Sequence, residues 1–116
     1  MTEITIYHNP RCSKSREALQ LLQSKNKKFH IIEYLQTPLS TKEIKHILQL
    51  SGMQVRYIMR SNETVYKELQ LENPKLTDST LIQAIIAHPI LLQRPIIVTE
   101  KKAVIARPTE LLLKII

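Results

Sequence analysis

Residues 3–16 read EITIYHNPRCSKSR, a stretch that combines a strand, a break and the beginning of a helix. The β-branched run Glu3–Tyr7 predicts a short strand. Pro10 has no amide hydrogen to donate, so the chain must leave the sheet there. From Ser13 to about Lys25 the apolar residues recur at helical spacing. Cys12 is therefore expected between the end of a strand and the first turn of a helix.

The rest of the chain continues this alternation. Phe29–Tyr34 predicts a second strand, and a strand–helix–strand opening implies a parallel pair joined by a right-handed crossover. Ser40 and Glu43 have the spacing of a capping box at the start of a helix that Gly52 can end. Four further features are expected: short helices over 55–71, a helix capped by Thr77 or Asp78 and ended before Pro89, strands Ile96–Thr99 and Ala103–Ala106, and a last helix capped by Thr109.

This order of elements, β-α-β, then helices, then β-β-α, indicates an α/β fold with a thioredoxin-like mixed sheet. At 116 residues the chain has room for one domain. We therefore expect a single thioredoxin-like domain over 1–116, with a helical insertion at about 40–90.

Composition excludes several classes of function. Gly52 is the only glycine, so no glycine-rich phosphate loop or dinucleotide fingerprint can form. The single cysteine rules out an internal disulfide and a thiolate-clustered metal site, and His30, His46 and His88 lack ligand spacing, so no metal is expected. No membrane-spanning run or signal pattern occurs, which favours a cytoplasmic protein with a free thiol.

The charge balance points to anionic partners. Seventeen Lys and Arg against ten acids give a net charge of +7. Aromatic residues total 4% and the lysines are spread along the chain, which argues against a nucleic-acid module. Small-anion chemistry explains the same charge at least as well.

Cys12 has the surroundings of a reactive thiol. Helix amide groups and the cationic residues Arg11, Lys14 and Arg16 lower a cysteine pKa from about 8.5 into a range of roughly 3.5–7.5. The alternative is a buried, inert cysteine. Ser15 stands where a thioredoxin has its resolving cysteine, so a redox cycle needs an external thiol, most plausibly glutathione. His8 is either a further influence on the thiol or an exposed loop histidine.

Two arginines flank the predicted hairpin. If Glu100 and Lys101 form a two-residue turn, cross-strand partners sum to 201, which pairs Arg94 with Arg107. Like charges opposite each other destabilise a sheet, so this pairing suggests an anion between them; the alternative is two solvated edge residues. Arg94-Pro95 is also where a thioredoxin-type domain places a cis proline beside its thiol.

The chain resembles the glutaredoxin-coupled arsenate reductases, and most of all their short arsenate-reductase-like relatives. The resemblance runs over almost the whole length, through ITIYHNPRCSKSR, IIEYLQTP, VRYIMRSN, HPILLQRPIIVT and ARPTE. It implies that Cys12 is the nucleophile, that His8 helps to lower the thiol pKa, and that Arg60, Arg94 and Arg107 bind the oxyanion. Arg60 comes from the resemblance alone, because VRYIMRSN offers Arg56 equally.

The resemblance also implies the reaction: arsenate is reduced to arsenite through a Cys12 thioarsenate, with glutathione as co-substrate, glutaredoxin as partner and no bound cofactor. We expect a monomer that binds neither nucleic acid nor membrane. The sequence lacks the C-terminal tail of longer members, and its Arg-Cys-Ser-Lys loop is common in the arsenate-reductase-like subgroup. The main alternative is an Spx-type regulator of RNA polymerase, which Ser15 and the Arg107–Glu110 element (Arg-Pro-x-Glu) argue against.

Overall fold

The computed structural model describes residues 3–116, and the chain divides into two compact units. The first unit comprises the chain up to Thr37 together with Arg94–Ile116, and the second is Pro38–Gln93. The bounds of the second unit, Pro38–Gln93, nearly coincide with those of the predicted helical insertion, about 40–90. That the whole chain forms one domain stays a prediction, and residues 1–2 of that span lie outside the described part.

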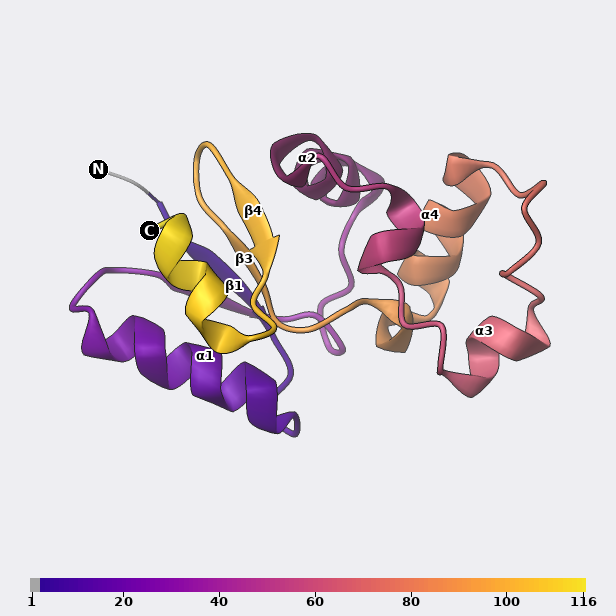
Figure 1. The fold of residues 1–116 in the computed structure, drawn as a ribbon. Coiled ribbons are helices and arrows are strands. Elements are labelled where there is room, and N and C mark those ends of the chain that lie inside the picture. The colour runs from indigo at the N-terminus through magenta and orange to yellow at the C-terminus, as the bar shows by residue number, and fades with distance from the viewer. Residues whose placement is uncertain (1–2) are drawn as a thin grey trace. The chain divides into compact units, whose positions relative to one another are not determined.

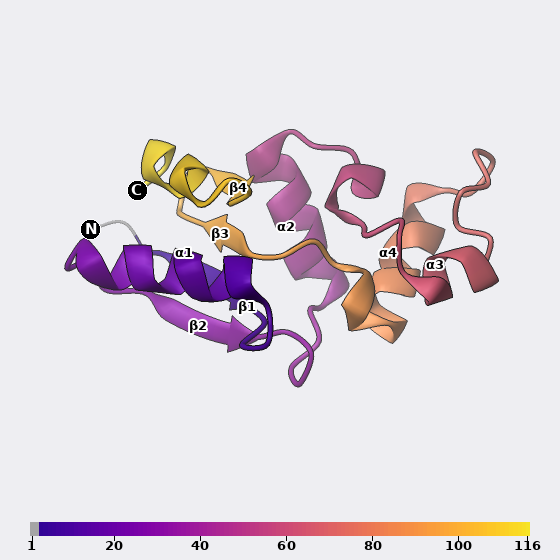
Figure 2. The same cartoon turned by 60° about the horizontal axis from the view of Figure 1, so that its bottom comes forward.

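The first unit is built on a four-stranded mixed sheet in the order β2-β1-β3-β4. β1 (Thr5–His8) pairs in parallel with β2 (His30–Glu33), and the connection between them contains α1 (Ser13–Ser24), as the sequence predicts. β3 (Ile96–Val98) is antiparallel to β1 and to β4 (Ala103–Ile105). Figure 2 shows α1 running along β1 and β2.

The hairpin between β3 and β4 has the predicted register. Ile96 pairs with Ile105 and Val98 with Ala103, so partner numbers sum to 201. The amide of Ala106 donates to the carbonyl of Pro95 over 3.0 Å, which extends the pairing beyond the strands. Arg94 and Arg107 are therefore the next residues at this end of the hairpin. Both are followed by cis prolines.

The core of the first unit lies between one face of the sheet and two helices. α1 packs beside η3 (Thr109–Lys114), a short 3-10 helix at the C-terminus (Figure 1). Apolar residues from both helices and from the strands form one buried cluster: Ile4, Ile6, Ala18, Leu22, Ile97, Ala106 and Leu112. Burial of these side chains fixes β1 and α1, and with them the loop that carries Cys12.

The second unit consists of short helices. They are α2 (Thr41–Ser51), η1 (Val55–Ile58), α3 (Thr64–Glu68), α4 (Asp78–Ala87) and η2 (Pro89–Leu91). Ser40 and Glu43 form the predicted capping box, and Gly52 ends α2 with a left-handed φ of 71°. Thr77 caps α4 by accepting from the Thr80 amide, which decides between the two predicted caps.

The strand bounds and one predicted helix cap differ in the structure: β1 begins at Thr5 and ends at His8, and β3 and β4 each end one residue earlier than predicted. The second strand is shorter than predicted, because Phe29 and Tyr34 lie outside β2. The predicted cap at Thr109 is wrong: the last helix is 3-10, Pro108 precedes it, and no side chain caps it. The Thr109 hydroxyl instead donates to Glu17 of α1 over 3.2 Å, a tertiary partner that local pattern cannot reveal. In the described part of the chain, no helix is long and apolar enough to cross a membrane.

Candidate active site

The loop between β1 and α1 holds Cys12 at the helix N-terminus. Cys12 is the N-cap residue of α1, with extended backbone angles, and its amide donates to the Asn9 carbonyl over 3.0 Å. The Asn9 side chain accepts from the Arg11 amide at 3.0 Å, which closes the turn before the cysteine. Pro10 ends the strand and the helix begins at Ser13. The thiol therefore lies where the free amide groups of the first helical turn can reach it.

Ser15 connects this loop to His8. Its hydroxyl accepts from the Asn9 amide at 3.0 Å and lies 2.7 Å from Nδ1 of His8. Ser15 is completely buried and His8 is 5% exposed, so the alternative of an exposed loop histidine is wrong. Burial is the main cause that lowers the pKa of His8; the Glu33 carboxylate opposes it and Arg16 adds to it. The lowered pKa favours the neutral imidazole, whose Nδ1 can accept a hydrogen bond from the Ser15 hydroxyl.

The pKa of the Cys12 thiol is lowered below its ordinary value. Burial, the largest single influence, raises the pKa, but four favourable interactions together outweigh it. These are hydrogen bonds from the backbone amides of Ser15 and Lys14, a hydrogen bond from the Arg94 guanidinium, and the charge of that guanidinium. Cys12 is 9% exposed, yet the neighbours of its sulfur stabilise an anion rather than an inert thiol.

Arg94 has donor capacity left over after it contacts the thiol. Its Nε is the one buried side-chain nitrogen or oxygen without a hydrogen-bond partner within residues 3–116. A buried donor without a partner is costly, and native proteins rarely leave one unless a ligand or water satisfies it. The guanidinium of Arg107 is exposed, and it makes no hydrogen bond or ion pair with the described residues. The register of the hairpin thus places the guanidinium groups of Arg94 and Arg107 at the same end of the sheet as the thiol. Both still have N–H groups without a partner among the described residues.

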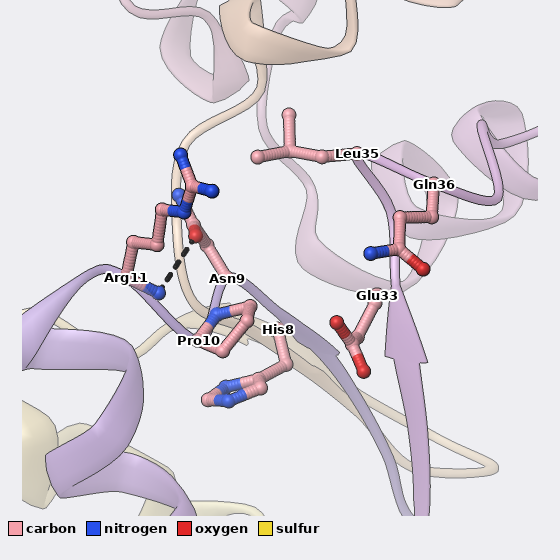
Figure 3. A pocket seen from close by; sticks show the side chains of 7 residues that line it. All are labelled: His8, Asn9, Pro10, Arg11, Glu33, Leu35 and Gln36. Atoms are coloured by element: carbon pink, nitrogen blue, oxygen red, sulfur yellow. Dashed lines mark hydrogen bonds between the residues drawn. The ribbon is translucent and has the colours of Figure 1, made fainter.

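A pocket of about 240 Å³ opens beside the Cys12 loop (Figure 3). The end of β1 and the loop supply one wall, and the end of β2 with the residues after it supplies the other. The lining residues are His8, Asn9, Pro10, Arg11, Glu33, Leu35 and Gln36. Sequence reasoning missed Glu33 and Gln36; the parallel pairing of His8 with Glu33 is the signal that could have found them.

Arg56 and Arg60, equivalent in the sequence, have different surroundings in the second unit. Arg56 donates to the Tyr66 hydroxyl and to the carbonyls of Leu71 and Asn73, so its guanidinium holds a turn of backbone. Among the described residues, the Arg60 side chain makes one interaction, an ion pair with Glu63 at 2.5 Å. Arg60 is therefore the arginine of the two that can rearrange to bind a ligand, and its place in the anion site stays a prediction. No group of three or more metal-ligating side chains occurs among residues 3–116.

We expect alanine substitutions of these two arginines to have different effects: that of Arg56 on stability and that of Arg60 on activity. Arg56→Ala should lower the free energy of unfolding by about 2 kcal/mol, because it removes charge-assisted bonds to two carbonyls. Arg60→Ala should cost less than about 1 kcal/mol, the value of one partly exposed ion pair. Urea denaturation measures both. In the reaction that the resemblance implies, measured at a temperature where both variants are folded, only Arg60→Ala should be impaired; impairment of Arg56→Ala alone would contradict the assignment.

The Cys12 thiol should react as a thiolate at a lower pH than a free cysteine. Its alkylation rate with iodoacetamide should rise with pH and level off at an inflection below about 8.5. Because the folded pKa lies below the unfolded one, the thiolate's contribution to stability is complete above the unfolded pKa and is lost as pH falls through the folded one. Alkylation of the urea-unfolded chain is the control. An inflection at or above the unfolded value would contradict the description.

Fold and site together define a class: a thioredoxin-like α/β protein with one activated thiol at a helix N-terminus and an arginine against it. Residues 7–115 match the ArsC family model. The chain is 46% identical over 111 residues to an arsenate reductase of Neisseria meningitidis serogroup A, covering 95% of each. It is 40% identical over 116 residues to an arsenate reductase of Escherichia coli K12, covering all of this chain and 82% of that one.

A solved arsenate reductase structure from Vibrio cholerae superimposes with a TM-score of 0.96 at 43% identity, covering 99% of this chain and 98% of that chain. The chain belongs to the ArsC family. The predicted resemblance and the predicted fold class, a mixed sheet of the thioredoxin-like arsenate reductase kind, are both confirmed. The share of the Escherichia coli relative that is covered agrees with the expectation that longer members exist.

Proposed function

We propose that this chain reduces arsenate to arsenite, with Cys12 as nucleophile and with glutathione and glutaredoxin as the source of electrons. The observation that carries the proposal is the contact between a stabilised Cys12 thiolate and Arg94, whose buried Nε–H has no partner among the described residues. A donor left over beside a nucleophile suits a tetrahedral oxyanion that accepts the donor and presents its central atom to the sulfur. The relatives named arsenate reductase support the same substrate.

The first step binds and attacks arsenate. Arg94 donates to an arsenate oxygen, with Arg107 and Arg60 as further donors. The Cys12 thiolate attacks arsenic, a sulfur–arsenic bond forms, and one oxygen leaves as water after taking up protons. Arginine suits this step because its planar fork matches an oxyanion and stays charged throughout. Arsenic remains pentavalent in the thioarsenate, so no electron has yet been transferred.

The second step moves two electrons to arsenic. A glutathione thiolate attacks the Cys12 sulfur, a disulfide forms, and the sulfur–arsenic bond breaks with its electron pair on arsenic, which leaves as arsenite. Ser15 cannot supply a resolving thiol, so a thiol from another molecule must cleave the disulfide. In the proposal this is glutaredoxin, which takes the glutathionyl group and returns Cys12 as thiolate. The whole cycle oxidises two thiols and belongs in a reducing cytoplasm.

The test couples arsenate to NADPH oxidation with purified protein. One arm contains glutathione, glutaredoxin and glutathione reductase, and the other contains thioredoxin and thioredoxin reductase. We expect arsenate-dependent NADPH oxidation in the first arm only. Phosphate is the matched control, because it has the same shape and charge but accepts no electrons. Absence of arsenate-dependent oxidation in both arms would overturn the substrate, and equal rates in the two arms would overturn the glutathione coupling.

A further inference from the structure

The pocket beside the Cys12 loop is lined by charged side chains of both signs. The Glu33 carboxylate and the Arg11 guanidinium line it, and neither makes a hydrogen bond or ion pair within residues 3–116. The side-chain amide of Gln36, also at the rim, has no hydrogen bond with the described residues either. Figure 3 shows Glu33, Leu35 and Gln36 facing the wall formed by the Cys12 loop, with the Glu33 carboxylate turned toward that wall.

This combination fits a small zwitterion. A carboxylate on one wall can accept from an ammonium group, and a guanidinium on the other can donate in a fork to a carboxylate. A volume of about 240 Å³ lies below the roughly 300–1,000 Å³ of pockets for whole drug-sized ligands, so the pocket suits one end of a ligand. An α-amino-acid head carries an ammonium and a carboxylate on one carbon and has about this size.

The pocket also adjoins the loop that carries the reacting sulfur. Arg11 is the residue before Cys12, and the Cys12 amide donates to the carbonyl of Asn9, another lining residue. In a γ-glutamyl thiol such as glutathione, the α-amino-acid head is separated from the sulfur by about two residue lengths, roughly 7 Å when extended. A head bound between Glu33 and Arg11 therefore leaves the sulfur within reach of the cysteine loop.

We propose that this pocket is the subsite for the γ-glutamyl head of the thiol that attacks the Cys12 adduct, with Glu33 binding its ammonium group and Arg11 its α-carboxylate. The inference rests on the proposed function, since it assigns a place to the thiol of the second step. It adds a reason for selecting glutathione over other thiols: the head orients the glutathione sulfur toward the Cys12 sulfur and lowers the entropic cost of the attack.

The first experiment measures binding without turnover. S-methylglutathione, which cannot react, is titrated by NMR into the chain and into Glu33→Gln and Arg11→Gln. We expect each substitution to weaken binding about tenfold, the loss of one charge-assisted contact. Glu3→Gln is the matched control, because it removes the same charge before β1 begins, at the end of that strand away from His8. Equal affinity in all four proteins, or no binding to the wild-type chain, overturns the subsite.

The second experiment compares two thiols in arsenate reduction. Cysteinylglycine has the same thiol as glutathione but lacks the γ-glutamyl unit. Glu33→Gln should lower kcat/KM for glutathione about tenfold more than it lowers kcat/KM for cysteinylglycine. Glu33 also raises the pKa of His8, and a loss of that effect would change both thiols equally, which contradicts the subsite. If S-methylglutathione binds as expected but arsenate is not reduced, the proposed function fails and the subsite stands. If arsenate is reduced but S-methylglutathione does not bind, the subsite fails and the proposed function stands.

Discussion

Cys12→Ser is expected to lower arsenate reduction more than about 1,000-fold, to the background of the assay. Serine keeps the size of the side chain, but its hydroxyl does not ionise near neutral pH, and its oxygen cannot form the sulfur–arsenic bond or the disulfide that follows. In the proposed mechanism both chemical steps use the same sulfur, so no partial reaction should remain. Removal of a nucleophile from an assembled site has effects of this size or larger in well-studied enzymes.

The measurement is arsenate-dependent NADPH oxidation with glutathione and glutaredoxin in excess. Ser13→Ala is the matched control, because Ser13 is the exposed neighbour at the start of α1 and its side chain makes no hydrogen bond within residues 3–116. Thermal unfolding of both variants shows that the fold is kept. Turnover by Cys12→Ser within tenfold of the wild-type rate would rule out Cys12 as the nucleophile.

Arg94→Ala is expected to lower kcat/KM for arsenate by about 100- to 1,000-fold, the usual effect of removing one charge-stabilising donor from an active site. Two causes act together. The variant loses the donor that we propose for arsenate, and it loses the hydrogen bond and the charge that lower the Cys12 pKa. The inflection in the alkylation profile should therefore move to higher pH in this variant. Arg94→Lys should recover part of the pKa effect but less of the anion binding, because lysine lacks the planar fork.

Lys14→Ala is the control for general electrostatics. It removes one positive charge from the same helix turn but keeps the backbone amide that donates to the sulfur. Lys14 is about half exposed and pairs with Glu17 at 3.6 Å, so we expect less than a threefold change in kcat/KM. If Lys14→Ala and Arg94→Ala have equal effects, the contact between Arg94 and the thiol is not specific, and net charge explains the activity.

The sequence was sufficient wherever the interacting residues are neighbours along the chain. Ser40 and Glu43 satisfy each other's helix-end groups within one turn, and Gly52 adopts a backbone angle that other residues resist. The hairpin register followed from a two-residue turn, since a turn's length sets every pairing after it. Thr109 shows the limit of this reasoning: Pro108 takes the N-cap position in the folded chain, and the Thr109 hydroxyl donates to Glu17 of α1.

Tertiary structure decided the features on which the chemistry depends. Burial made His8 a neutral partner of Ser15, although the cationic neighbours in the sequence are equally consistent with a solvated histidine. Arg56 differs from Arg60 because, in the folded chain, its guanidinium donates to the carbonyls of Leu71 and Asn73 and to the Tyr66 hydroxyl.

What the sequence determined by itself is the reactive group and its immediate frame: one thiol between a strand that Pro10 ends and a helix that begins at Ser13. What only the fold decided is which distant groups reach that frame, namely Arg94 at the thiol and Glu33 across the pocket. The physical reason is range. Capping and turn preferences act over a few residues, whereas desolvation and charge act through space and depend on which strands the buried core brings side by side.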